Sequence, residues 1–411
     1  MSLARNIEFL RQMPKLQGLN AWQGFGPGIA RGTRGPLVET EGFGTNPGAL
    51  RMFSFVPEDL RPQPALVVVL HGCGQTATGY DLGAGWSALA KDYGFALLMP
   101  EQQATNNVHS CFNWFNPEDT KRGQGEALSI RQMIARMVSQ HRIDKHRIFV
   151  AGLSAGGAMT SVMLATYPDV FAAGAIIAGL PYGIATNVRE ALSGMMQSRP
   201  RPSGDLGNLV RTASKHRGPW PRVSIWHGSA DRTVNPANAD EIIKQWLDVH
   251  RLPSGPMSEG MVDGYPHQIW WNADGETIVE SYSITDMAHG TPLGKAENDE
   301  RYGKEGAFLI EAGISSSYHI ANFFGLTAGI HQPETVAKPA SRAAAESPSA
   351  KLIPLASPIP ASAPDLNKVS RPLASAKPTP IPPAKPKATR SGGLDVGAVI
   401  TRALTAAGLM K

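Results

Sequence analysis

The chain has 411 residues, more than one hydrophobic core usually organises, so its composition has to show how it is divided. Every Trp, Tyr and Phe lies at or before Phe324, and 13 of the 33 Pro fall within residues 333–386. The last 87 residues therefore exclude an ordinary core, and the first 324 suit a single α/β domain.

The net charge of +5 is concentrated in the C-terminal part of the chain. Residues 333–390 carry nine Lys and Arg against three Asp and Glu, and residues 391–411 add +1, which leaves −2 for residues 1–332. Because the aromatic-rich part is not basic, we predict no nucleic-acid partner. No stretch approaches the ~20 apolar residues that cross a bilayer, so the sequence predicts a soluble protein without a membrane span.

The first 48 residues give weak structural signals. Residues 3–13 have helical spacing, and Gly and Pro are dense over residues 18–48, which predicts an irregular segment that covers a surface. We therefore assign residues 1–48 to an N-terminal helix and a covering segment. Charged and polar residues, among them Arg5 and Glu8, interrupt the apolar run that a secretory signal needs.

Strand-like and helix-like runs alternate over residues 49–326. Unbroken β-branched runs such as ALVVVL at 65–70 are typical of strands buried in a parallel sheet. The predicted strands are 50–56 (an edge strand), 65–70, 95–99, 147–151, 172–178, 222–226 and 275–284. The predicted helices are 86–93, 125–140, 156–167, 236–250 and 306–324. This alternation predicts an α/β domain with a mostly parallel central sheet flanked by helices.

The C-terminal part divides into a linker and a short helix. Residues 327–393 are rich in Pro, Ala, Ser and Lys, which predicts a disordered linker. Residues 394–411 place Val396, Val399, Ile400 and Leu404 on one helical face. This pattern favours a short amphipathic helix that docks back or binds a partner, with a frayed tail helix as the alternative.

A nucleophile motif follows one of the predicted buried strands. Residues 152–156, Gly-Leu-Ser-Ala-Gly, match G-x-S-x-G, follow the strand RIFVA and precede an Ala- and Met-rich helix. A nucleophile elbow needs this strand-turn-helix context, because a sharp turn has to lift the serine hydroxyl above the sheet. The motif predicts an α/β-hydrolase fold with Ser154 as the nucleophile.

A serine nucleophile needs an acid and a base later in the chain. In this fold the order is Ser, Asp, His, and Asp231 follows the predicted strand 222–226. His289 lies beside a glycine in the loop after the strand 275–284 and is the predicted base. The alternatives are Asp205 and Asp263 in loops and Asp240 in a helix for the acid, and His227 and His267 for the base.

The oxyanion donors are predicted from backbone position. The amide after the nucleophile belongs to Ala155, and a second amide is expected from the loop LHGCGQ after the strand 65–70. We predict that Cys73 supplies this second amide. His71 in the same loop is expected to brace it with a hydrogen bond.

These segments together resemble the polyhydroxybutyrate depolymerase family of esterases, which includes feruloyl- and acetylxylan-esterase-like members. The resemblance spans residues 50–324 and is carried by LHGCGQTATGYDLGAGWSALAKDYGFALLMPEQ, CFNWFNPEDTKRGQGEALSIRQMI, RIFVAGLSAGGAMTSVMLATYPDVFAAGAIIAGLPYG and WHGSADRTVNP. It implies the same triad of Ser154, Asp231 and His289 with Cys73 as an oxyanion donor, and no metal or cofactor.

The resemblance also implies a disulfide between Cys73 and Cys111 and an extracellular location. Such bonds persist in oxidising surroundings, and the N-terminal segment shows no secretory signal. Free thiols and a cytoplasmic location are therefore the alternatives.

The sequence thus predicts a serine esterase that forms an acyl-enzyme and acts on poly- or oligo-3-hydroxybutyrate or on short-chain esters. The first alternative is a feruloyl or acetylxylan esterase acting on plant polysaccharides. The second is a non-catalytic protein whose tail contacts a polyester granule or a partner. Trp114, Trp270 and Trp271 are candidates for the substrate pocket, with burial in the core as the alternative.

Overall fold

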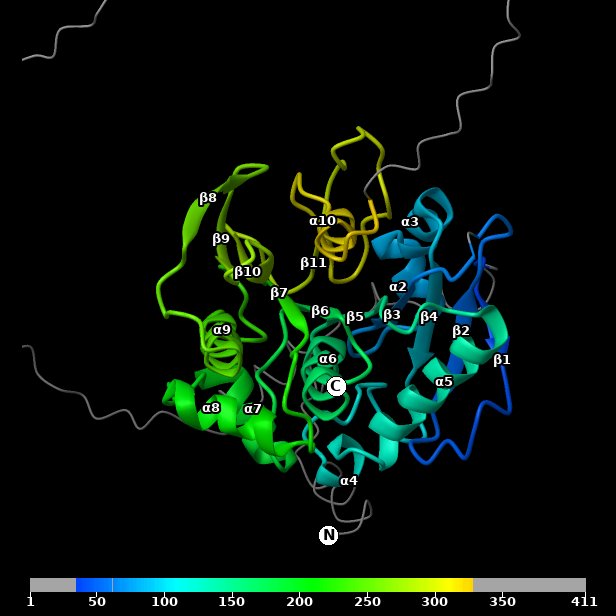
Figure 1. Cartoon of the computed structure of the whole chain (residues 1–411), viewed down its shortest axis with the longest axis horizontal. Coiled ribbons are helices and arrows are strands. Elements are labelled where there is room, and N and C mark those ends of the chain that lie inside the picture. Colours follow the sequence, from blue (N-terminus) through cyan, green and yellow to red (C-terminus); the bar gives the residue numbers. More distant parts are fainter. Residues whose placement is uncertain (1–34, 61, 328–411) are drawn as a thin grey trace, which may run out of the picture. The chain divides into compact units, whose positions relative to one another are not determined.

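The computed structural model of the chain describes residues 35–60 and 62–327. The predicted N-terminal helix, the linker and the C-terminal helix lie outside the described residues. The described part is built around one ten-stranded sheet, to which strands from residue 38 to residue 284 contribute (Figure 1).

The centre of the sheet is parallel and its two margins are antiparallel. In spatial order the strands are β1 (Val38–Thr40), β2 (Arg51–Phe55), β4 (Ala96–Glu101), β3 (Leu66–Leu70), β5 (Ile148–Leu153), β6 (Ala173–Ile177), β7 (Arg222–Gly228), β10 (Thr277–Ile284), β9 (Tyr265–Trp271) and β8 (Ser258–Val262). The six central strands of this order run parallel; they are β4, β3, β5, β6, β7 and β10. The strands β1, β2, β9 and β8 pair antiparallel with their neighbours. A separate parallel pair joins β11 (Thr291–Leu293) to β12 (Leu309–Glu311).

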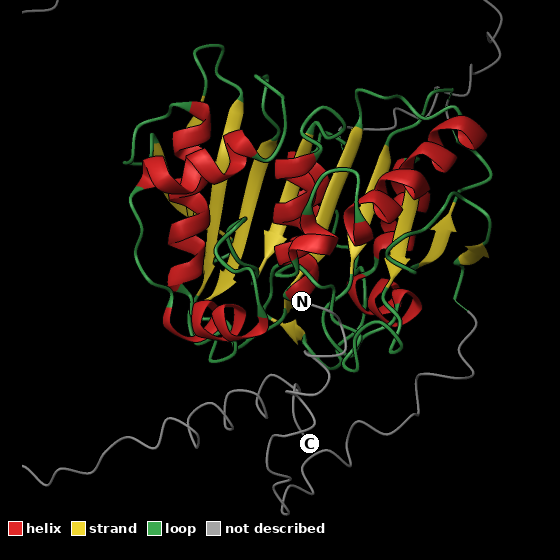
Figure 2. Ribbon diagram, turned by 90° about the horizontal axis from the view of Figure 1, so that it is seen from below, coloured by secondary structure: helices red, strands yellow, loops and turns green. Residues whose placement is uncertain are grey.

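Helices cover both faces of this sheet (Figure 2). One face carries α2 (Ala77–Ala84), α3 (Trp86–Tyr93) and α10 (Ser316–Phe323). The other carries α4 (Pro117–Thr120), α5 (Gly125–His141), α6 (Ala155–Thr166), α7 (Val188–Gln197), α8 (Ser203–Thr212) and α9 (Ala237–His250).

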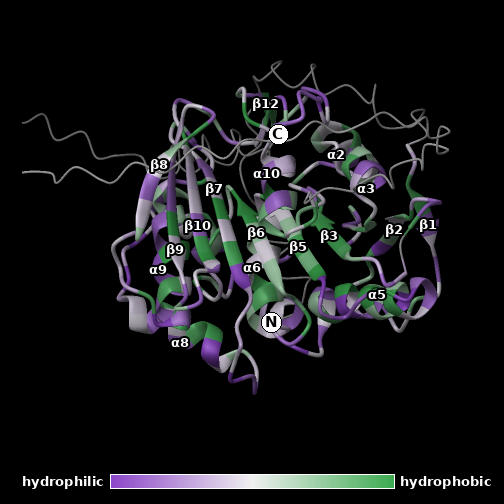
Figure 3. Ribbon diagram, turned by 45° about the horizontal axis from the view of Figure 1, so that its top comes forward, coloured by the Kyte–Doolittle hydropathy of each residue, from purple (hydrophilic) through white to green (hydrophobic). Residues whose placement is uncertain are grey.

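The central strands are apolar on both sides because both sides are covered (Figure 3). In β3 the side chains of Leu66, Val68 and Leu70 enter the core beneath α5, α6 and α9, whereas Val67 and Val69 enter the core beneath α2, α3 and α10. All five are fully buried, and each such side chain contributes about 1.5–3 kcal/mol of transfer free energy. The unbroken run ALVVVL follows directly from this arrangement.

The predicted mostly parallel sheet with flanking helices is confirmed, with three local corrections. The strand predicted at 50–56 is not an edge strand, because Val38–Thr40 pairs beyond it, inside the segment expected to be irregular. The helix predicted at 306–324 begins only at Ser316, because residues 309–311 form β12. Asp205, expected in a loop, lies in α8.

Four helices, α2, α4, α7 and α8, were not predicted. Helix α2 contains two glycines, and a Cβ on one of them, Gly83, would lie 2.0 Å from Leu309 Cδ1. The glycine therefore serves packing where its propensity argues against a helix. Within residues 35–60 and 62–327, no helix is long and apolar enough to cross a membrane.

Candidate active site

Ser154 occupies a strained turn between β5 and α6. Its backbone has φ 57° and ψ −116°, which a non-glycine residue rarely adopts, and its amide donates to Ile177 O at 2.9 Å. A Cβ on Gly152 would lie 2.3 Å from Gly156 O, and one on Gly156 would lie 2.2 Å from Leu70 O. Both flanking glycines of the motif are therefore required by the close approach of strand and helix.

The three residues predicted to act together are in direct contact. His289 Nε2 lies 2.9 Å from Ser154 Oγ, and His289 Nδ1 lies 2.6 Å from Asp231 Oδ2. They follow β5, β7 and β10, whose parallel directions bring their carboxyl ends to one edge of the sheet. All three are buried, with at most 9 % of their surface exposed.

The carboxylate of Asp231 is held by four donors. Its Oδ1 accepts the amides of Thr233 at 2.8 Å and Val234 at 2.9 Å, and its Oδ2 faces His289 and, at 3.2 Å, His227 Nε2. Burial alone would raise the pKa of Asp231. The contacts with His227 and His289 outweigh burial and hold that pKa well below its ordinary value, so the group is ionised at neutral pH.

The loop after β3 presents a free amide to the same place. The amide of Gly72 donates to Gln75 Oε1 at 2.9 Å, and the amide of Gly74 donates to His109 O at 2.8 Å. Between them, the Cys73 amide meets no acceptor within the described part of the chain. Ala155 is the first residue of α6, where no preceding turn supplies a carbonyl. Two donors are thus available for a developing oxyanion.

A disulfide fixes this loop. Cys73 and Cys111 are bonded, with their Cα atoms 4.3 Å apart, so the structure contains the bond and not the free thiols that were the alternative. The bond therefore links Cys73, whose amide has no acceptor among the described residues, to the segment that precedes α4.

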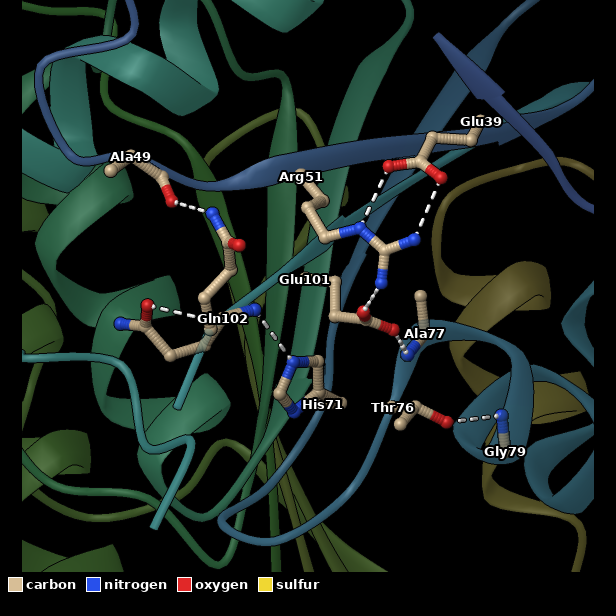
Figure 4. A network of polar contacts seen from close by, with 10 residues as sticks. Glu39, Ala49, Arg51, His71, Thr76, Ala77, Gly79, Glu101 and Gln102 are labelled. Atoms are coloured by element: carbon tan, nitrogen blue, oxygen red, sulfur yellow. Dashed lines mark hydrogen bonds and ion pairs between the residues drawn. The ribbon is translucent and has the colours of Figure 1, made fainter. Parts of the chain in front are cut away.

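His71 braces the loop after β3 with a hydrogen bond, as expected, and Figure 4 shows its contact with Gln102. The Gln102 amide donates to His71 Nε2 at 3.1 Å, so the ring proton sits on Nδ1, which donates to Gly72 O at 2.8 Å. Burial lowers the pKa of His71 to about 4, which keeps the ring neutral. Figure 4 also shows Glu101 joining Arg51 to the first amide of α2, at Ala77.

A cavity of about 20 Å³ lies against Ser154 and is lined by Gly72, Cys73, Leu153, Ser154, Met195, Thr233, His289 and Phe308. None of the three candidate tryptophans lines it. Trp114 and Trp270 are buried in the core, and Trp270 Nε1 donates to Gly255 O. Trp271 pairs with Thr277 at the start of β10, whereas His289 follows the end of that strand. The tryptophan assignment is therefore corrected.

The other candidates for acid and base are placed elsewhere. His267 lies in β9, 3.1 Å from Glu280 Oε2, and Asp263 pairs with His319 at 2.9 Å. Asp205 and Asp240 lie in α8 and α9. His227 is near the site, where its Nε2 lies 3.2 Å from Asp231 Oδ2, the oxygen that His289 also contacts, and its other contact is with Val234 O.

Sequence reasoning missed three lining residues, Met195, Thr233 and Phe308. Thr233 follows Asp231 by two residues, and that proximity could have indicated it. Met195 lies on the apolar side of α7, and the position of Phe308 depends on the pairing of β11 with β12, so neither sequence pattern indicates the cavity that the residue lines.

Comparisons with known proteins show what this sequence is similar to. A family profile described as Esterase PHB depolymerase matches residues 55–254. The chain is 46 % identical over 291 residues to poly(3-hydroxyalkanoate) depolymerase C of Paucimonas lemoignei, covering 71 % of this chain and 70 % of that protein. It is 32 % identical over 276 residues to an acetylxylan esterase of Coprinopsis cinerea, covering 65 % of this chain and 72 % of that protein.

Among solved structures, the acetyl xylan esterase from Aspergillus awamori superposes with a TM-score of 0.60 at 24 % identity. The superposition covers 71 % of this chain and all of that one. At this identity the likeness concerns the fold alone, and it agrees with the α/β fold that the sequence predicted.

Proposed function

The chain belongs to the PHB depolymerase family of esterases and is a carboxylic ester hydrolase, and on this basis we propose that it acts through Ser154, His289 and Asp231. His289 Nε2 takes the proton of Ser154 as Oγ attacks the ester carbonyl, and Asp231 holds the imidazole in the required tautomer. The imidazolium then protonates the departing alcohol, leaving an acyl group on Ser154. Water, deprotonated by the same imidazole, releases the acid and restores the serine.

The observation that carries this proposal is the continuous chain of contacts from Asp231 Oδ2 through His289 to Ser154 Oγ, at 2.6 and 2.9 Å. The amides of Cys73 and Ala155 support it, because a backbone N–H beside the nucleophile that has no other acceptor among the described residues can stabilise the negative charge on the carbonyl oxygen. An oxyanion donor of this kind contributes about 2.7–4 kcal/mol to transition-state stabilisation.

We propose short aliphatic esters and oligomers of 3-hydroxyalkanoates as the substrates. The small cavity beside Ser154 supports an aliphatic acyl group over the flat ring of a feruloyl ester. The most similar relative reported above acts, by its name, on poly(3-hydroxyalkanoate).

Acetylated xylan is the second candidate substrate. It is favoured by the small cavity, which suits an acetyl group, and by the similarity to an acetylxylan esterase. A panel of 3-hydroxybutyrate trimer, acetylxylan and methyl ferulate separates the candidates by kcat/KM.

Replacing the nucleophile tests the proposal. In Ser154→Ala we expect hydrolysis of p-nitrophenyl butyrate to fall by at least about a thousandfold with an unchanged circular dichroism spectrum. Ser161→Ala is a matched control, because Ser161 is buried in α6 and donates to Leu180 O at 2.7 Å, away from the cavity. Turnover retained in Ser154→Ala would refute the mechanism.

Contact with a polyester granule is proposed for the tail, residues 327–411, on its sequence alone. Its excess of Lys and Arg and its apolar positions near residue 400 suit a surface that is partly anionic and partly apolar. Removing residues 327–411 should lower co-sedimentation with poly(3-hydroxybutyrate) granules and leave the kcat for p-nitrophenyl butyrate unchanged. Equal co-sedimentation of both proteins would remove the tail's role.

An oxidising, extracytoplasmic compartment is proposed for the protein. The Cys73–Cys111 bond supports it, because such bonds rarely persist against cytoplasmic reductants. Fractionation of the native host, followed by thiol labelling of the enzyme, tests this. Enzyme confined to the cytoplasm with two free thiols would contradict it.

A further inference from the structure

A disulfide or hydrogen bonds hold the backbone at several residues that line the cavity beside Ser154. Cys73 is tied to Cys111 by the disulfide, and the Thr233 amide donates to Asp231 Oδ1 at 2.8 Å. Phe308 has a left-handed backbone with φ 62°, and its carbonyl accepts the Thr291 amide at 2.8 Å. These bonds fix the backbone of Cys73, Thr233 and Phe308.

Met195 differs from the other lining residues. Its side chain has three rotatable bonds and a polarisable sulfur, so it adapts its shape at low cost. It is half-buried on α7, a helix in which only Ala191 is fully buried. Met195 packs against the core only in part, and it is the lining side chain whose shape adapts most readily.

The backbone of Met195 is nevertheless held in place relative to the triad. The Asn235 amide donates to Met195 O at 2.7 Å, and Asn238 Nδ2 donates to Gly194 O at 3.1 Å. Asn235 lies on the loop 229–236, which also carries Asp231. The loop that carries the triad acid thus also fixes the point from which the Met195 side chain reaches the cavity.

We propose that Met195 determines the length of acyl chain that the site accepts, a proposal that rests on the function proposed above. During the reaction the acyl group stays bonded to Ser154, so its carbon chain has to occupy the cavity that Ser154 lines. At about 20 Å³ this cavity holds little more than one water-sized sphere. An acyl chain longer than acetyl fits only when the Met195 side chain swings outward, and the reach of that swing sets the upper limit.

The test compares p-nitrophenyl acetate, butyrate and octanoate in the full-length enzyme. For Met195→Ala we expect the ratio of kcat/KM for octanoate to that for acetate to rise about tenfold or more, the discrimination that one or more methylenes provide in an apolar pocket. For Met195→Phe, a stiffer and bulkier wall, the butyrate-to-acetate ratio should fall by a similar factor. Met196→Ala is the matched control on the next residue of α7, whose side chain does not line the cavity.

Each ratio is taken within one preparation, so a partly unfolded variant does not distort it. The proposal is supported if the octanoate-to-acetate ratio of kcat/KM rises in Met195→Ala and is unchanged in Met196→Ala. Unchanged ratios in both Met195 variants, or equal changes in the Met196 control, overturn it. Ser154→Ala separates failure of the Met195 proposal from failure of the proposed function. If Ser154→Ala is inactive and the kcat/KM ratios of the Met195 variants are unchanged, only the role of Met195 is refuted. An active Ser154→Ala variant refutes the proposed function itself.

Discussion

His227 and His289 contact the same oxygen of Asp231, at 3.2 and 2.6 Å from Oδ2. His227 Nε2 also lies 3.0 Å from Val234 O, and because both neighbours are acceptors this nitrogen carries a proton. Its Nδ1 is buried without a partner in the described part of the chain. We therefore infer that His227 is a positioning residue, which holds the carboxylate that in turn orients the imidazole of the proposed triad.

Replacing His227 should slow turnover without weakening substrate binding. We expect His227→Phe to lower kcat about ten- to hundredfold with KM nearly unchanged, because a hydrogen bond to a charged group is lost. His227→Gln keeps an N–H donor at a similar reach and should recover most of the rate. Steady-state kinetics on p-nitrophenyl butyrate measure both. A Phe variant with full kcat, or a Gln variant no better than Phe, contradicts the positioning role.

Removing the disulfide should lower both the free energy of unfolding and kcat. The bond closes a 38-residue separation, and the loop-entropy relation gives roughly 3–4 kcal/mol of unfolding free energy for such a loop. In the Cys73→Ala, Cys111→Ala double variant we expect the free energy of unfolding, measured in urea, to fall by that amount. We also expect a lower kcat, because the amide at position 73 is no longer held. Unchanged kcat would show that the brace does not matter for catalysis.

Closing the space at the nucleophile turn should abolish activity. An alanine at Gly156 places its Cβ 2.2 Å from Leu70 O and 2.6 Å from His71 O, so the strand or the helix has to move. A displacement of this kind near the reacting atoms costs at least about a hundredfold in kcat/KM. Gly204→Ala in α8, where a Cβ meets nothing within 4 Å, is the control and should be neutral or stabilising by up to about 1 kcal/mol. Full activity in Gly156→Ala would show that the turn tolerates a Cβ.

Asp81 should make the protein less stable as pH rises. Burial raises its pKa from 3.8 to about 6, against the hydrogen bond from the Ser87 amide, and its Oδ2 has no partner among the described residues. The folded state therefore binds more protons than the unfolded state between pH 3.8 and 6. The free energy of unfolding falls through that window, by up to about 3 kcal/mol above it.

Asp81→Asn removes this dependence. Relative to the parent protein, the variant should gain about 1–3 kcal/mol at pH 7.5 and little at pH 4, as measured by urea unfolding at the two values. Asp274→Asn, on the exposed turn between β9 and β10, is the control. The same difference at both pH values would contradict the assignment.

The sequence predicted the parts of the site that local patterns encode. Ser154 lies in a five-residue motif after a buried strand, and Asp231 and His289 each follow a strand, so parallel strands bring them together. Helix α7 has apolar residues at helical spacing, and Asn187 precedes it as an N-cap, so this helix carried a sequence signal that was overlooked. Trp114 and Trp270 misled because large aromatic side chains often fill the core. Trp271, by contrast, is exposed and pairs with the start of β10, the end opposite His289.

Trapping the nucleophile covalently tests the central claim most directly. The full-length enzyme is treated with diethyl p-nitrophenyl phosphate, which transfers its phosphoryl group to an activated serine, and the digest is read by mass spectrometry. We expect one label per chain, located on Ser154 and appearing as activity is lost, and almost none in His289→Ala. Complete inactivation with Ser154 unmodified, or equal labelling of Ser154 without His289, would contradict the account.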